Sequence, residues 1–215
     1  MSKQSTGGGR IARAIVQQAE NGFLIKAIDP LTDQPVGPPD PADTRIVADT
    51  LRDVRTFVSI PADIEVLIDS NYFPGGEDGF LSHLMRDHVT GVIGFAVNPD
   101  AIRKVVTNPN LSDARYAEWY DSPRTYESLL ARTVAHEAGH YWYNERSVLS
   151  DSQHTETNST LLKWGDFAKR NMTALSKGAQ LNVSITEGFA DAFASYTTSH
   201  DLAPLTRQWM RDNLK

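Results

Sequence analysis

The segment His136-Glu137-Ala138-Gly139-His140 has residue types and a spacing suited to metal chemistry. On a helix, histidines four positions apart lie one turn apart on the same face, so both imidazoles can bind one metal ion. Glu137 lies beside them, where a carboxylate can act as a general base. In the alternative without a metal, both histidines are ordinary core residues on one helix face and Glu137 is solvated, but this spacing seldom arises by chance. The pattern therefore predicts a metal site with Glu137 as its catalytic residue.

A third ligand is expected later in the chain, because a catalytic zinc site normally has three protein ligands and one open position. Glu187, in the segment TEGFAD, is the candidate. Asp191 follows one helical turn later and could accept the other ring N–H of a ligating histidine, fixing its orientation. Alternatively, Ser184 and Glu187 form a helix-capping box, in which Glu187 binds only a backbone amide. The ligand interpretation is favoured because capping explains neither Asp191 nor the need for a third ligand.

Together, HEAGH and the later EGFADAFA resemble the motifs of the gluzincin branch of the zincin metallopeptidases. The second motif is similar in particular to soluble minimal gluzincins and to peptidases of the ImmA/IrrE type. The resemblance covers residues 136–140 and 187–194 and the coarse order of strand, zinc helix and glutamate helix. It implies a zinc metalloendopeptidase that acts on a peptide or protein substrate. In such an enzyme His136, His140 and Glu187 bind Zn²⁺, and Glu137 activates water.

The resemblance also gives a role to the segment 91–97 (GVIGFAV). In zincins an edge strand above the cleft pairs with the extended substrate backbone. This would make Gly94, Phe95 and Ala96 substrate-binding residues. A plain core strand is an equal alternative.

The sequence assigns no residue to stabilise the oxyanion that peptide hydrolysis produces. On an ideal helix Tyr196 lies about 180° round from Glu187, so it should face away from the metal. His154 is expected in a polar loop. Tyr143 and His200 are the other candidates.

The elements expected to position these residues form an α+β fold. Alternating or continuous apolar residues predict strands at 23–28, 63–69 and 91–97. Helical spacing and caps predict helices at 10–20, 46–57, 80–88, about 124–145, 158–176, 185–199 and 202–214. A proline-rich surface loop is expected at 29–43.

The expected organisation is a flexible tail at 1–9 followed by a single zincin-like domain at 10–215. This domain combines a small mixed sheet and an active-site helix with a helical C-terminal part. The zinc site would lie between the helices at about 124–145 and 185–199.

Composition limits the partners that this 215-residue chain is expected to have. Its 21 basic and 27 acidic residues give a formal charge of -6 without a basic cluster, which argues against nucleic acid. Cysteine is absent, so a thiolate zinc site and a disulfide scaffold are excluded. Neither a membrane-length apolar run nor a secretory signal is found. We therefore expect no membrane partner and a cytoplasmic protein, with a virion component or signal-independent export as alternatives.

The competing function is a non-enzymatic interaction module in which the same zinc site only holds helices together. Glu137 argues against it, because a structural site needs no general base. Such a site would also usually close its fourth coordination position with a protein ligand.

Overall fold

The computed structural model describes residues 18–20, 23–26, 40–60, 64–68, 81–87, 91–107, 125–148, 151–175, 180, 184–199 and 202–214. The predicted tail at 1–9, the first part of the predicted helix at 10–20 and most of the proline-rich loop lie outside these ranges. So does His200.

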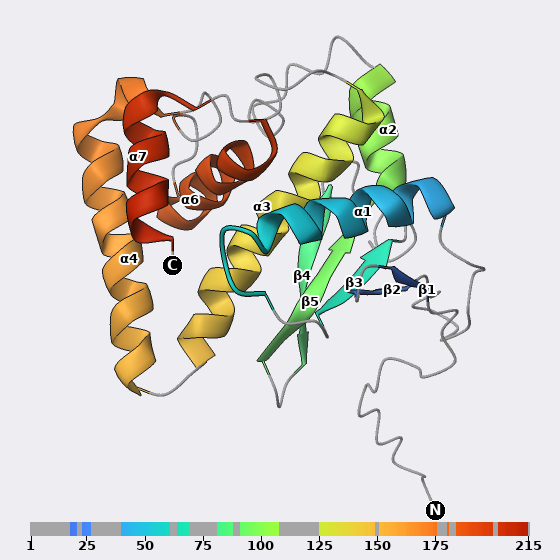
Figure 1. Ribbon diagram of the computed structural model, residues 1–215, viewed down its shortest axis with the longest axis horizontal. Coiled ribbons are helices and arrows are strands. Elements are labelled where there is room, and N and C mark those ends of the chain that lie inside the picture. Colours follow the sequence, from blue (N-terminus) through green and yellow to red (C-terminus); the bar gives the residue numbers. More distant parts are fainter. Residues whose placement is uncertain are drawn as a thin grey trace, which may run out of the picture.

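A five-stranded mixed sheet forms one side of the fold (Figure 1). Its strands are β1 (Gln18–Glu20), β2 (Phe23–Lys26), β3 (Glu65–Ile68), β4 (Ser82–Asp87) and β5 (Gly91–Val97). In space the order is β1-β2-β3-β5-β4. The inner strands β2, β3 and β5 are parallel, whereas β1 and β4 run antiparallel at the two edges.

Helices make up most of the described part of the chain. They are α1 (Pro41–Val54), α2 (Pro99–Thr107), α3 (Tyr126–Val148), α4 (Asp151–Arg170), α6 (Ile185–Ala194) and α7 (Pro204–Asn213). A short 3-10 helix, η3 (Met172–Ala174), follows α4, and a π-helical turn, η4 (Ser195–Ser199), extends α6. The long helix α3 packs on β4 and β5 and also contacts α1 and α6. It therefore joins the sheet to the C-terminal helices α4, α6 and α7, which lie to the left of α3 in Figure 1, opposite the sheet.

Two helix predictions are wrong. The segment predicted as a helix at 80–88 is strand β4, which pairs antiparallel with β5 from Ser82↔Val97 onwards. Pairing with a neighbouring strand overrides a local pattern of this length. The end of the segment predicted as a helix at 10–20 is likewise a strand, β1, paired with β2.

Several element boundaries also differ from the sequence-based prediction. Helix α1 begins at Pro41, inside the predicted loop, because the Asp40 carboxylate accepts a 2.8 Å hydrogen bond from the Ala42 backbone N–H. Helix α4 begins at Asp151, so His154 lies in a helix and not in a loop. Helix α2 was not predicted.

Strand β5 is confirmed, but its expected position at a sheet edge is wrong. It pairs with β3 on one side and with β4 on the other, and Phe95 and Ala96 are fully buried. A Cβ atom at Gly94 would clash with the backbone carbonyl of Glu65, so glycine is needed here for β3 to pair. A substrate backbone cannot pair with β5 at these positions, because both of its sides are already bonded to other strands.

An aromatic cluster joins the C-terminal helices to α3. The ring of Phe189 on α6 stacks on Trp142 of α3, with centroids 5.8 Å apart. It also meets Trp164 of α4 edge-on at 5.9 Å, and Trp164 in turn contacts Trp209 of α7 at 5.1 Å. Each such pair contributes about 0.5–1.5 kcal/mol beyond its buried area. The cluster therefore fixes α6 against the middle of α3.

Candidate metal centre

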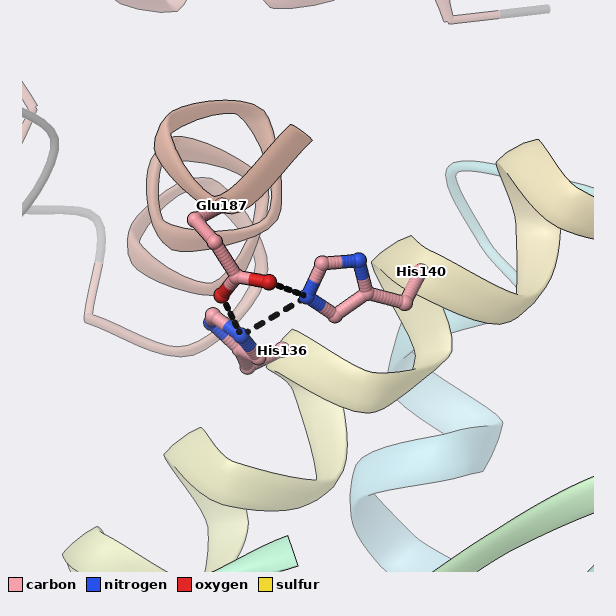
Figure 2. Close-up of side chains that lie close together, drawn as sticks. All are labelled: His136, His140 and Glu187. Carbon is pink, nitrogen blue, oxygen red and sulfur yellow. Dashed lines mark hydrogen bonds and ion pairs between the residues drawn. The ribbon is translucent and has the colours of Figure 1, made fainter. Parts of the chain in front are cut away.

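Helix α3 presents His136 and His140 side by side, as the sequence predicts (Figure 2). The two Nε2 atoms are 3.0 Å apart, and the ring centroids are 4.7 Å apart with the planes at 73°. Both histidines are buried. The other faces of the helix are packed as well, because Val134, Ala135 and Ala138 are fully buried in the core.

Helix α6 brings Glu187 to the same point. Its carboxylate lies between the two imidazoles, with Oε2 3.3 Å from His136 Nε2 and Oε1 3.2 Å from His140 Nε2 (Figure 2). Hydrogen bonds from the two histidines lower the pKa of the Glu187 carboxyl well below its usual range, although burial acts in the opposite direction. The capping interpretation is not supported, because Ser184 begins the helix without a side-chain capping bond. Its hydroxyl lies 2.7 Å from that of Thr186 instead.

The three side chains have the donor set and the spacing of a metal site. Their ligand atoms all lie within 4.8 Å of one another, and no further donor joins the group within the described part of the chain. Ligands of a tetrahedral zinc ion at about 2.0–2.1 Å are separated by about 3.3 Å. The observed separations of 3.0, 3.2 and 3.3 Å are close to this value. His136, His140 and Glu187 could thus hold a metal ion with little rearrangement.

Gly139, within the metal motif, allows α6 to approach α3 closely. A Cβ atom at this position would lie 3.0 Å from Phe193 Cδ1 and 3.4 Å from the backbone Cα of Ala190, both on α6. The absence of a side chain at Gly139 therefore helps to bring Glu187 within reach of the histidines.

Behind the histidines lies a buried charged pair. Asp191, one turn after Glu187, places Oδ1 3.6 Å from His136 Nδ1, on the side of the ring predicted from the sequence. Arg132, one turn before His136, places Nη2 3.7 Å from the same Asp191 oxygen. The two charged side chains are 0% and 1% exposed. The sequence analysis missed Arg132, although an arginine in the mostly apolar run before HEAGH could have indicated a buried partner.

Glu137 points toward the sheet, where it meets Ser82. The Ser82 hydroxyl on β4 donates a 2.6 Å hydrogen bond to Glu137 Oε1. The glutamate is 5% exposed and Ser82 is half-buried, so this contact is partly shielded from water. Ser82 was also missed, because its segment was predicted as a helix and the two residues are 55 positions apart.

The predicted oxyanion candidates are dispersed. Tyr143 is half-buried beside the site, with its ring centroid 6.5 Å from that of His140. Tyr196 packs edge-on against Phe57 at 5.0 Å. His154 lies on α4.

Comparisons with protein-family models, curated proteins and solved structures found no match. Within the described residues, no helix has the length and apolar character needed to span a membrane. The geometry of the candidate metal centre is therefore the basis for assigning a function.

Proposed function

We propose that this protein is a metal-dependent hydrolase, specifically a zinc metalloendopeptidase. The convergence of His136, His140 and Glu187 from two helices carries this proposal, because a buried set of two imidazoles and one carboxylate suits catalytic zinc. Glu137, beside the two histidines on α3, supplies the base that peptide hydrolysis requires. The proposal includes a zincin-like arrangement of the single domain at 10–215.

When bound by these three residues, Zn²⁺ would supply a Lewis acid for the scissile carbonyl and the attacking water. Glu137 accepts a proton from the water while the water oxygen bonds to the carbonyl carbon of the scissile peptide. It then passes that proton to the amine nitrogen as the C–N bond breaks. Asp191 holds the His136 ring from behind, and Arg132 balances the charge of Asp191.

The edge strand β4, and not β5, is the strand that we assign to substrate binding. It pairs only with β5 among the described residues, and it runs along α3 beside Glu137. An extended peptide could therefore add to its outer edge by main-chain hydrogen bonds. This revised assignment keeps a peptide or protein as the expected substrate. It replaces Gly94, Phe95 and Ala96 on β5 with β4 as the strand that binds the substrate.

The competing interaction module requires the same ligands but gives Glu137 no task. A structural zinc site normally has four protein ligands, whereas the group found in the described residues has three. A buried carboxylate beside an incomplete ligand set favours the enzyme.

The proposal is tested by incubating the purified protein with a proteome-derived peptide library. Parallel samples contain a zinc chelator, or chelator followed by excess zinc. We expect cleavage that is lost with chelator and restored by zinc. A protein that contains stoichiometric zinc but cleaves no peptide would support the interaction module instead.

A further inference from the structure

We infer that Ser82 is a positioning residue for Glu137: its hydroxyl holds the carboxylate of the general base in the orientation that accepts a proton from water. This inference rests on the proposed function. It assigns a reaction role to the edge strand β4 in addition to binding the substrate backbone.

The contact between the two side chains is short and partly buried. The Ser82 Oγ to Glu137 Oε1 distance of 2.6 Å is within the range of charge-assisted O–H···O⁻ bonds, which are about twice as strong as neutral ones. A carboxylate that is 5% exposed has few water molecules to orient it, so a direct donor has a large influence on its direction. Fixing Oε1 in this way sets the direction in which Oε2 points.

Ser82 can serve as a fixed reference because backbone bonds hold its position on both flanks. It begins β4 opposite Val97 of β5, and the carbonyl of the preceding Leu81 accepts a 2.7 Å hydrogen bond from the Asn98 N–H. The Asn98 side chain in turn accepts a 3.0 Å bond from the Ala101 N–H at the start of α2. The serine is therefore tied to the sheet and to α2, independently of the helix that carries Glu137.

Holding Glu137 from both the helix and the sheet has a specific kinetic consequence. Misplacing a reacting group by about 1 Å can reduce the rate by about 100-fold. The hydrogen bond of the Ser82 side chain goes to Glu137 and not to a candidate metal ligand, and a backbone-paired substrate does not need this side chain. Loss of the hydroxyl should therefore lower kcat while leaving KM and metal binding almost unchanged.

The test compares Ser82→Thr with Ser82→Val, which have nearly the same shape and differ in the hydroxyl group. With a peptide identified in the library assay, we expect kcat of Ser82→Val to be about tenfold below that of Ser82→Thr, with KM values within about twofold. Zinc titration should give equal affinities for the two variants. Equal kcat values for the two variants would overturn the inference.

A second measurement needs no substrate. The thermal midpoint of Ser82→Val should lie about 2–4 °C below that of Ser82→Thr, because a buried carboxylate loses its donor. In a Glu137→Ala background the hydroxyl has no carboxylate to bind, so Ser82→Val should be at least as stable as Ser82→Thr. A lower midpoint of Ser82→Val that persists without the Glu137 carboxylate would overturn the inference, because the hydroxyl would then act on another partner.

The peptide assay of the native protein and the kcat comparison together separate the failure of this inference from the failure of the proposed function. A native protein that cleaves peptides, together with equal kcat values for the Thr and Val variants, removes the role of Ser82 alone. A zinc-loaded native protein that cleaves nothing overturns the proposed function, and the role of Ser82 in catalysis falls with it.

Discussion

Two buried aspartates, each near an arginine, lie in contrasting regions of this protein. Asp191 on α6 and Arg132 on α3 are both inaccessible, with Oδ1 and Nη2 3.7 Å apart. Asp43 on α1 is equally buried, with Oδ2 3.5 Å from Arg103 Nη2 on α2, but that arginine is 47% exposed. The first pair lies behind a candidate metal ligand, and the second lies where α1, α2 and α3 meet.

The contrast shows what each pair is suited to do. Burying both members of an ion pair costs more desolvation energy than burying one. Stability alone therefore explains poorly the pair of Asp191 and Arg132, called here the inner pair. Asp191 Oδ1 lies 3.6 Å from His136 Nδ1, so we propose that this pair orients His136 as a candidate ligand. At the helix junction Arg103 covers the ring of Tyr126 at 4.7 Å, which ties α2 to the start of α3. Changes around Asp191 should therefore alter metal binding, whereas changes around Asp43 should alter only folding stability.

The largest expected effect is loss of the metal. His136→Ala and Glu187→Ala each remove one of three ligands, so the purified variants should contain little of the one zinc per chain expected in the native protein. Metal analysis measures this, with Asp43→Asn as the matched control that should keep its zinc. Undiminished zinc in either ligand variant would refute that ligand assignment.

A smaller loss is expected from Asp191. Removing a carboxylate that orients a metal-bound histidine typically costs about 10- to 100-fold in metal affinity. Asp191→Asn preserves the shape and can still accept one hydrogen bond, so its loss should be smaller than that of Asp191→Ala. Zinc titration, with circular dichroism to verify folding, gives the ranking. Native affinity in Asp191→Ala would show that the inner pair is structural and would remove the contrast with Asp43.

Substitutions of two helical glycines, Gly139 on α3 and Gly165 on α4, test how closely these helices must pack against α6. In Gly139→Ala the new methyl group meets a buried ring and the α6 backbone, so we expect a net loss of about 1–2 kcal/mol in the free energy of unfolding and weaker zinc binding. Gly165→Ala is the control. Its Cβ atom would lie 3.3 Å from the flexible end of Ile185, which is 46% exposed, so better helix propensity should stabilise it by up to about 1 kcal/mol. Chemical denaturation measures both, and equal effects would contradict tight packing at Gly139.

The smallest expected effect is on how folding stability depends on pH, and it involves the outer pair, Asp43 and Arg103. Burial raises the pKa of Asp43 above 3.8, despite the opposing effects of Tyr126 and Arg103. The folded protein therefore binds this proton more readily than the unfolded chain does. Its contribution to stability should rise as the pH falls through the folded pKa and be complete below 3.8.

Asp43→Asn removes this proton and provides the comparison. The native protein should gain stability relative to the variant on acidification, by at most about 1.4 kcal/mol per pH unit. Denaturation of both proteins at neutral and acidic pH gives the difference. A native protein that loses stability relative to the variant on acidification would mean that the ion pair with Arg103 outweighs burial.

The local part of the candidate site could be predicted from the sequence. His136 and His140 are joined by one helical turn, as are Glu187 and Asp191, so their relative placement follows from helix geometry. The prediction that these two helices meet at the site required only the chemical expectation of a third ligand.

The parts that escaped prediction depend on contacts between distant segments. Strand β4 is set by pairing with β5, and Ser82 reaches Glu137 only because of that pairing. Similarly, the central position of β5 depends on β3 and β4, which no local pattern in residues 91–97 encodes. The partner of Arg132 is identified only once the fold places Asp191 opposite it.

The most direct test of the central claim is the rate of peptide hydrolysis by Glu137→Gln at verified metal content. An amide cannot accept the proton of the attacking water, so the variant should keep its fold and about one zinc per chain. Its kcat should fall by about 100-fold or more. Turnover of a verified peptide at the native rate by the zinc-loaded variant would contradict the assignment of Glu137 as the base.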